Sequence, residues 1–88
     1  MNTVFRGSFA RDLKRIKDPL ALDRIRKVIE EVMAATTLHE VGNLKKLSGT
    51  SIYFRIRISD YRIGLAAKAE TVEFIRCLPR RDLYRYFP

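Results

Sequence analysis

Residues 53–65 carry the alternation of two β-strands joined by a short turn. Apolar and cationic side chains alternate strictly over 54–58, and apolar residues resume every second position over 61–65. A period of two residues is typical of a strand with one buried face. We therefore predict a β-hairpin with Ser59-Asp60 as its turn, which constrains how the rest of the sheet pairs.

The predicted hairpin gathers three arginines on one face. With a two-residue loop, Arg57 lies opposite Arg62, and Arg55 lies opposite Gly64. Like charges placed directly opposite one another destabilise a pair of strands. A bound anion, most simply a phosphate backbone, would explain the cluster. The alternative is a solvated sheet face whose basic residues prevent aggregation.

Length and charge limit the classes of protein. The 88 residues predict one domain spanning 1–88, and 47% hydrophobic residues suffice for a packed core. The net charge of +8 indicates a nucleic acid, an acidic protein or an anionic surface as partner. No apolar run approaches the ~20 residues that span a membrane. The single cysteine, Cys77, is expected to be buried in a protein of the reducing cytoplasm.

Two helices are predicted after a short strand at 1–6. Ser8 is positioned to N-cap a helix that begins at Phe9. Asp18-Pro19 then predicts a second N-terminus, with the helix running to Met33 or Ala35. The expected buried stripe of this second helix consists of Leu22, Ile25, Val28, Ile29, Val32 and Met33.

Strands are predicted at about 44–47, 52–58, 61–67 and 71–78. The last of these has apolar residues on both parities, which indicates a bulge or burial on both faces. The fold class is therefore α+β. An N-terminal strand is followed by an antiparallel helix hairpin on one face of a three- to four-stranded, mainly antiparallel sheet, and the chain ends in a short tail or helix.

The sequence carries few signals of catalysis. It has no glycine-rich phosphate loop and no metal-ligand cluster, so we expect neither a cofactor nor a metal. His39 stands alone in a predicted loop and is expected to be a surface residue rather than a base.

The remaining candidates are basic and aromatic. Arginine binds phosphate oxygens in a bidentate manner and stabilises charge in a transition state, but it cannot act as a general base. Tyrosine stacks on bases or transfers a proton. Such a set equips a metal-free ribonuclease or a plain RNA-binding face, and the tail tyrosines could equally pack over the core. The candidates are Lys45, Lys46, Arg55, Arg57, Arg62, Arg80, Arg81, Tyr84 and Tyr86.

In order and spacing, four segments together resemble the RelE/ParE superfamily of bacterial toxins. They are the helix at 9–16, the lead-in at 43–49, the hairpin at 53–63 and the closing Arg80-Arg-Asp-Leu-Tyr84. The resemblance covers nearly the whole chain and implies a fold of the microbial-ribonuclease type. It also implies an endoribonuclease that cleaves mRNA on the ribosome without a metal and halts translation.

The resemblance also implies roles for individual residues. Arg55 and Arg57 match two basic positions, and Arg62 matches an arginine that stabilises the transition state. Arg80 matches an arginine that contacts the scissile phosphate or assists the leaving group. Either Tyr84 or Tyr86 matches the terminal tyrosine, which stacks on a base or takes part in proton transfer.

This sequence departs from the family pattern at three positions. The best-known ribosome-dependent member has lysines where this chain has Arg55 and Arg57, and many relatives have histidine or lysine at the position of Pro79. Phosphate binding is thus retained, whereas the general base has no assignment. A ParE-like toxin that acts on gyrase and a non-catalytic RNA-binding module are the alternatives.

The resemblance implies partners as well. A toxin of this kind is held by a cognate antitoxin in a hetero-oligomer, and the charge of +8 suits an acidic segment that folds on binding. We expect this segment to cover the arginine face or to displace residues 80–88. The ribosome and mRNA are the other expected partners.

Overall fold

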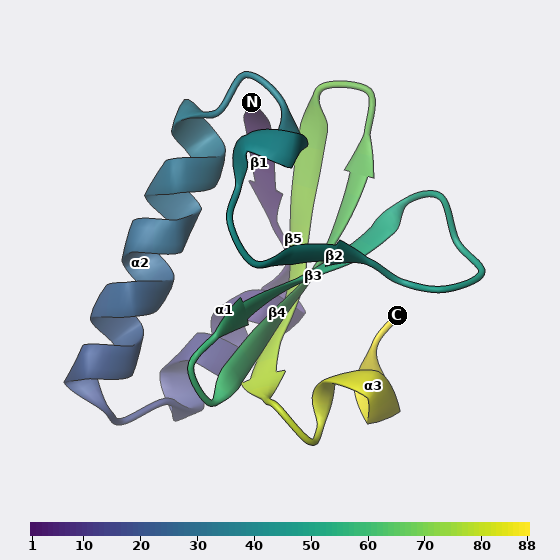
Figure 1. The fold of residues 1–88 in the computed structure, drawn as a ribbon. Helices are drawn as coiled ribbons and strands as arrows, with labels where there is room; N and C mark the ends of the chain where they lie inside the picture. Colours follow the sequence, from purple (N-terminus) through teal and green to yellow (C-terminus); the bar gives the residue numbers. More distant parts are fainter.

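A five-stranded sheet separates two long helices from one short C-terminal helix in the computed structural model, which describes residues 1–88 (Figure 1). The strand order is β1-β5-β4-β3-β2, with β1 parallel to β5 and the other pairs antiparallel. This confirms the predicted α+β class. The elements are β1 Asn2–Phe5, α1 Gly7–Arg15, α2 Pro19–Ala34, the 3₁₀ turn η1 Leu38–Glu40, β2 Leu44–Lys46, β3 Tyr53–Ile58, β4 Tyr61–Lys68, β5 Thr71–Pro79 and α3 Leu83–Tyr86.

The hairpin of β3 and β4 has the predicted register. Arg57 pairs with Arg62, and Arg55 pairs with Gly64. Ser59 adopts a left-handed backbone conformation with φ of 53°, so the two-residue turn closes without a glycine. The alternation along both strands therefore places the arginines on the face opposite the apolar residues Ile56 and Ile63, both fully buried.

A bulge in β5 accounts for its mixed apolar pattern. Gly64 pairs with Arg76 and Leu65 pairs with Phe74, so Ile75 is an extra residue in β5. Beyond it the alternation changes phase. Phe74 and Cys77 consequently both belong to the main core, whereas Leu78 belongs to a smaller cluster on the other face.

The start of α1 differs from the prediction. The helix begins at Gly7 rather than Phe9, and Ser8 lies inside it instead of capping it. The Ser8 hydroxyl donates a hydrogen bond to the carbonyl oxygen of Ile75. The pairing of β1 with β5 ends at Phe5 and Phe74, so beyond this point a side chain of α1, rather than a residue of β1, bonds to β5.

The start of α2 was predicted correctly. The Asp18 carboxylate accepts a hydrogen bond of 3.0 Å from the amide of Leu20, and Pro19 is the first helical residue. The predicted buried stripe was only partly right, because Leu22 and Met33 are exposed. The side facing the sheet contains Ala21, Ile25, Val28 and Val32, spaced by four, three and four residues. Leu22 and Met33 each lie one position away from this side, about 100° around the helix.

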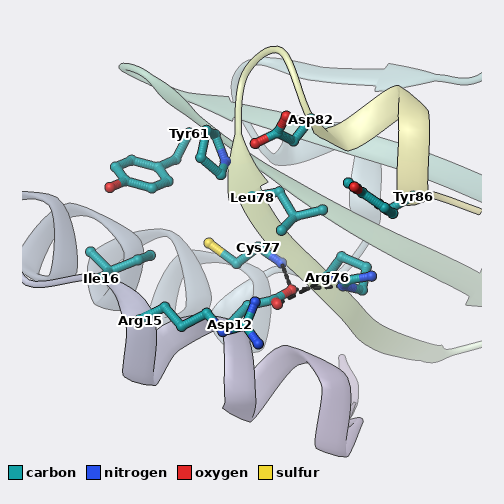
Figure 2. A pocket seen from close by; sticks show the side chains of 10 residues that line it. Asp12, Arg15, Ile16, Tyr61, Arg76, Cys77, Leu78, Asp82 and Tyr86 are labelled. Carbon is teal, nitrogen blue, oxygen red and sulfur yellow. Dashed lines mark hydrogen bonds and ion pairs between the residues drawn. The ribbon is translucent and has the colours of Figure 1, made fainter.

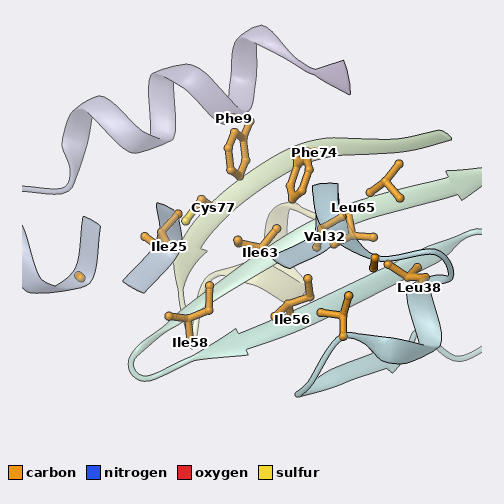
Figure 3. Packing of buried hydrophobic residues seen from close by; sticks show 14 of the residues in the cluster. Phe9, Ile25, Val32, Leu38, Ile56, Ile58, Ile63, Leu65, Phe74 and Cys77 are labelled. Carbon is orange, nitrogen blue, oxygen red and sulfur yellow. The ribbon is translucent and has the colours of Figure 1, made fainter. Parts of the chain in front are cut away.

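The main core lies between the sheet and the two long helices (Figure 3). Phe9 of α1 packs on Phe74 of β5 with ring centroids 5.3 Å apart, and Phe5 stacks on the same ring at 5.0 Å. Phe9 and Phe74 are fully buried, and burying each of these two side chains stabilises the fold by about 1.5–3 kcal/mol. Cys77 is buried here as predicted, and burial raises the pKa of its thiol to about 12.

A second, smaller core occupies the opposite face of the sheet. Leu78 of β5 packs with Leu83 of α3 and with Phe87. The Phe87 ring lies directly on Gly64, where an added Cβ atom would come within 2.7 Å of a ring carbon. The tail is thus part of the packed fold. None of the helices has both the length and the apolar stretch that crossing a bilayer would require.

Candidate nucleic-acid interface

Arginines from three segments meet on the sheet face opposite the two long helices. Arg55 and Arg57 come from β3, Arg62 comes from β4, and Arg80 follows β5. We call these four residues the arginine patch. Burial lowers the pKa of Arg62 below its ordinary value, and the nearby charges of Arg55, Arg80 and Arg57 lower it further. The register of β3 and β4, in which Arg57 pairs with Arg62 and Arg55 pairs with Gly64, brings the three hairpin arginines together on this face.

Arg62 lies at the centre of the patch and is held rigidly. It is 9% exposed, and its Nη1 donates hydrogen bonds of 2.9 Å to the carbonyl oxygens of Ser59 and Tyr61. Its Nε and Nη2 donors have no partner within the protein. Arginine has five N–H donors in a fixed fork, so this side chain keeps a free edge for a bidentate anion.

Arg55 is fixed by the loop before β2. Asn43, with φ of 61°, directs its carbonyl oxygen to the Nη1 of Arg55 at 2.8 Å and to the amide of Arg57 at 3.1 Å. The Nε of Arg55 is buried without a hydrogen-bond partner. Leaving a buried donor without a hydrogen-bond partner costs free energy. A bound anion is one group that would compensate for the charge of this guanidinium group.

The two predicted lysines lie on opposite faces. Lys45 pairs with Arg55 and therefore extends the arginine patch, whereas Lys46 pairs with Phe54 on the face of the two long helices. Because neighbouring strand residues point to opposite sides of a sheet, Lys45 lies on the face of the arginine patch and Lys46 does not.

The turn after β5 brings Arg80 and Arg81 to the end of the hairpin. The Arg80 amide donates a hydrogen bond of 2.7 Å to the carbonyl oxygen of Asp60. Arg80 and Arg81 are exposed, and with Asp60 and Pro79 they line an open, polar cavity of about 400 Å³. This cavity carries a net positive charge.

The two tyrosines of α3 lie in different environments. Tyr84 is 59% exposed and lies close enough to Arg62 to influence the pKa of its guanidinium group. Tyr86 is 55% exposed and lies beside Arg76, whose guanidinium carbon is 5.8 Å from the ring centroid. The structure therefore associates Tyr84, and not Tyr86, with the arginine patch.

A buried ion pair on the other side of α3 escaped the sequence analysis. Asp12 of α1 is 4% exposed and accepts hydrogen bonds from Arg76 at 2.8 and 3.1 Å and from the Cys77 amide at 2.9 Å (Figure 2). This hydrogen bond raises the pKa of Arg76. Neither Asp12 nor Arg76 stood out in the sequence. Asp12 lies between basic residues on a short helix, and this pattern suggests an exposed carboxylate.

The patch has the chemistry of an anion site. It offers several fixed N–H donors and a tyrosine, but no carboxylate or imidazole that could remove a proton at neutral pH. His39 is exposed in η1, as expected. No group of three or more histidine, cysteine, aspartate or glutamate side chains is arranged to hold a metal ion.

Comparison with known proteins agrees with this fold. Residues 4–84 match the family model of the ParE toxin of the type II toxin–antitoxin system parDE. Toxin RelE3 of Methanocaldococcus jannaschii is 36% identical over 89 residues, with both chains covered completely. The RelE toxin in a RelB-RelE antitoxin–toxin complex from Methanococcus jannaschii superposes with a TM-score of 0.82 at 35% identity, covering 97% of this chain and 99% of that one. A RelE-RelB complex from Pyrococcus horikoshii gives a TM-score of 0.72 at 17% identity, covering 90% and 93%, and so supports the fold alone.

The chain belongs to the RelE/ParE superfamily of toxins from type II toxin–antitoxin systems. Within it, the curated toxin that is 36% identical and the complex that is 35% identical bear the name RelE. The protein is therefore a toxin of the RelE type rather than the ParE type, as its sequence predicted.

Proposed function

We propose that this toxin is an endoribonuclease that cleaves mRNA on the ribosome and thereby inhibits translation. The observation that carries the proposal is the arginine patch, with Arg62 at its centre and Tyr84 beside it. The RelE relationship is consistent with it. A cytoplasmic location, where ribosomes and mRNA occur, follows from this proposal.

The reaction uses the nucleophile that RNA itself supplies. The ribose 2′-hydroxyl attacks the adjacent phosphorus, forming a 2′,3′-cyclic phosphate and breaking the bond to the 5′-oxygen of the next nucleotide. Charge builds up on the nonbridging oxygens as the phosphorus becomes five-coordinate. The free Nε and Nη2 donors of Arg62 and the exposed guanidinium of Arg80 are suited to stabilise that charge.

Tyr84 is the candidate for proton transfer or stacking in this reaction. Its exposed ring adjoins the arginine patch, whereas Tyr86 lies beside Arg76. None of the arginines is a base at neutral pH. The proton of the 2′-hydroxyl therefore passes to solvent or to a group of the ribosome, either directly or through the Tyr84 hydroxyl, which gives up its own proton in the same step. The departing 5′-oxygen takes up a proton from solvent or from the ribosome, which fits a requirement for the ribosome.

The proposal is tested by in vitro translation with primer extension on the mRNA. Wild-type protein is expected to generate new 5′ ends, and Arg62→Ala is expected to reduce cleavage by about 10²–10³-fold, as for other lost charge-stabilising donors. Arg62 also bonds to two backbone carbonyls, so Arg80→Ala provides a second variant on an exposed side chain.

Arg24→Ala is the matched control, because Arg24 is an exposed arginine of α2, whose buried side packs on the opposite face of the sheet. Equal cleavage by wild type, Arg62→Ala and Arg80→Ala would refute the proposed site. Intact mRNA with salt-sensitive RNA binding would instead identify a non-catalytic RNA-binding module.

We also propose that an acidic antitoxin is the cognate partner. The related RelE toxin was solved in complex with its antitoxin RelB. The charge of +8 and the unpaired arginine patch favour an acidic segment that covers the patch or displaces α3. Co-purification with the product of the adjacent gene, followed by protection of Arg80 from an arginine-modifying reagent, tests this proposal.

A further inference from the structure

Three residues other than glycine have a left-handed backbone conformation. Asn43, Ser59 and Ala69 have φ values of 61°, 53° and 52°. This region is disfavoured for L-residues because the Cβ atom crowds the following carbonyl oxygen. Residues with such a conformation cluster at functional sites, where the surrounding structure maintains it. Asn43 and Ser59 adjoin the arginine patch, whereas Ala69 lies in the turn between β4 and β5, at the opposite end of β4 from Arg62 (Figure 1).

The carbonyl oxygen of Ser59 holds the guanidinium group of Arg62. Nη1 of Arg62 donates one hydrogen bond to this oxygen and another to the carbonyl oxygen of Tyr61, each 2.9 Å long. Nη1 carries two hydrogens, so both are used. The N–H groups of Nε and Nη2 point the same way along another edge of the guanidinium plane, where they suit two oxygens of one phosphate. The backbone of the turn thus determines which edge of Arg62 an anion meets.

The carbonyl oxygen of Asn43 acts in the same way on β3. It accepts a hydrogen bond of 2.8 Å from Nη1 of Arg55 and one of 3.1 Å from the backbone amide of Arg57. Asn43 and Ser59 are both exposed, and each contacts its arginine through the backbone rather than through its side chain. The carbonyl dipoles also offset part of the repulsion among the clustered arginines, which lowers the pKa of Arg62.

We propose that Asn43 and Ser59 are positioning residues for the patch arginines, an inference that rests on the proposed ribonuclease function. The left-handed conformation of each residue directs a carbonyl oxygen at Nη1 of an arginine and so holds the guanidinium group in place before RNA binds. Because the group is already oriented, it need not move as charge develops on the phosphate. Loss of either contact should therefore lower the cleavage rate at saturating substrate more than it changes the affinity for RNA.

The test compares substitutions at residue 59 on ribosomes programmed with mRNA, with primer extension as the readout. Valine is β-branched and strongly disfavours a positive φ, whereas glycine adopts it freely. We expect Ser59→Val to lower the cleavage rate at saturating substrate about tenfold, and the conservative variant Ser59→Gly to restore it. In an Arg62→Ala background, Ser59→Val should cause no further loss. Asn43→Val and Asn43→Gly, each combined with Arg55→Ala, test the second contact in the same way.

Ala69→Val is the matched control, because it introduces the same backbone conflict at the opposite end of β4. It should lower the midpoint of urea denaturation about as much as Ser59→Val does, while the folded protein cleaves at the wild-type rate. Asn43→Val lies outside the hairpin turn and keeps the test decisive if Ser59→Val fails to fold. Equal cleavage by the control and the position-43 or position-59 valine variants, or independent losses in the double mutants, would overturn the proposal.

A second measurement does not depend on cleavage and so separates this inference from the proposed function. Two hydrogen bonds should slow rotation of Nη1, so NMR of the full chain should resolve its hydrogens for Arg62 in wild type and Ser59→Gly but not in Ser59→Val. Inorganic phosphate should then shift the Nε–H signal of Arg62 and leave the Nη1 signals in place. This result would support the positioning role even if wild type cleaved no mRNA. Displacement of the Nη1 signals by phosphate, or the same spectrum for wild type and Ser59→Val, would overturn it.

Discussion

Replacing the buried Asp12 by asparagine should destabilise the fold more than the same substitution of an exposed aspartate. The carboxylate accepts three hydrogen bonds while it is 4% exposed, one from the Cys77 amide and two from Arg76. Asparagine keeps one acceptor oxygen, but it turns an amide N–H₂ toward one of these donors. At least one donor is then left unsatisfied, and the charge of Arg76 loses its partner.

The expected cost is about 3 kcal/mol. Breaking a buried ion pair costs about 3–5 kcal/mol, and the lower end applies because the Arg76 side chain is 24% exposed and remains partly hydrated. A chain of 88 residues has a free energy of unfolding of about 4–13 kcal/mol. The substitution therefore removes between a quarter and three quarters of the total.

Urea denaturation followed by circular dichroism measures this effect. With a slope of about 1.5 kcal/mol per molar urea, the midpoint should fall by about 2 M. Asp23→Asn is the matched control, because Asp23 forms exposed ion pairs with Arg26 and Lys27 on α2. Its expected cost is much smaller, because ion pairs between exposed side chains contribute little to stability. A loss for Asp12→Asn no larger than that of the control would refute the assigned role of the buried pair.

Three further predictions concern the sheet. Gly64→Ala should cost about 1–3 kcal/mol because its methyl group would meet the Phe87 ring, and the loss should shrink in a Phe87→Ala background, as a double-mutant cycle would show. The pKa of the Cys77 thiol is raised to about 12 in the fold, whereas an unfolded thiol ionises near 9.0. Between these pH values the free energy of unfolding should therefore fall by about 1.4 kcal/mol per pH unit relative to that of Cys77→Ala. Parallel pH profiles of the free energy of unfolding for the two proteins would contradict this prediction. In filter binding, Arg57→Ala should weaken the affinity for uncleavable RNA and reduce the slope of log affinity against log salt concentration by about 0.7. In denaturation it should slightly stabilise the free protein, because Arg57 lies opposite Arg62. An unchanged slope would exclude a phosphate contact by Arg57.

Local patterns predicted most of the fold. The alternation over 53–65 defined the register of β3 and β4, and Asp18-Pro19 defined the start of α2, because each signal acts through backbone geometry within a few residues. The start of α1 was misassigned for the converse reason. Ser8 bonds to Ile75, 67 residues away, and no local rule anticipates such a partner.

The site was predictable where it depended on the hairpin and not where it depended on distant contacts. The register placed Arg55, Arg57 and Arg62 on one face directly. The nearness of Arg80 required the path of β5 and its bulge at Ile75, which the mixed apolar pattern only suggested. Asp12 remained unnoticed because its partners are more than 60 residues away in sequence.

The short helix α3 explains why spacing alone could not choose between its two tyrosines. Leu83 and Phe87 are four residues apart, share a side and pack on the sheet, which fixes the orientation of the turn. Tyr84 and Tyr86 are two residues apart and so diverge by about 200° around the axis. Tyr84 consequently lies near enough to Arg62 to influence its pKa, whereas Tyr86 lies beside Arg76. An arginine followed four or six residues later by tyrosine fits either arrangement, and only the anchoring of Phe87 on Gly64 distinguishes the two.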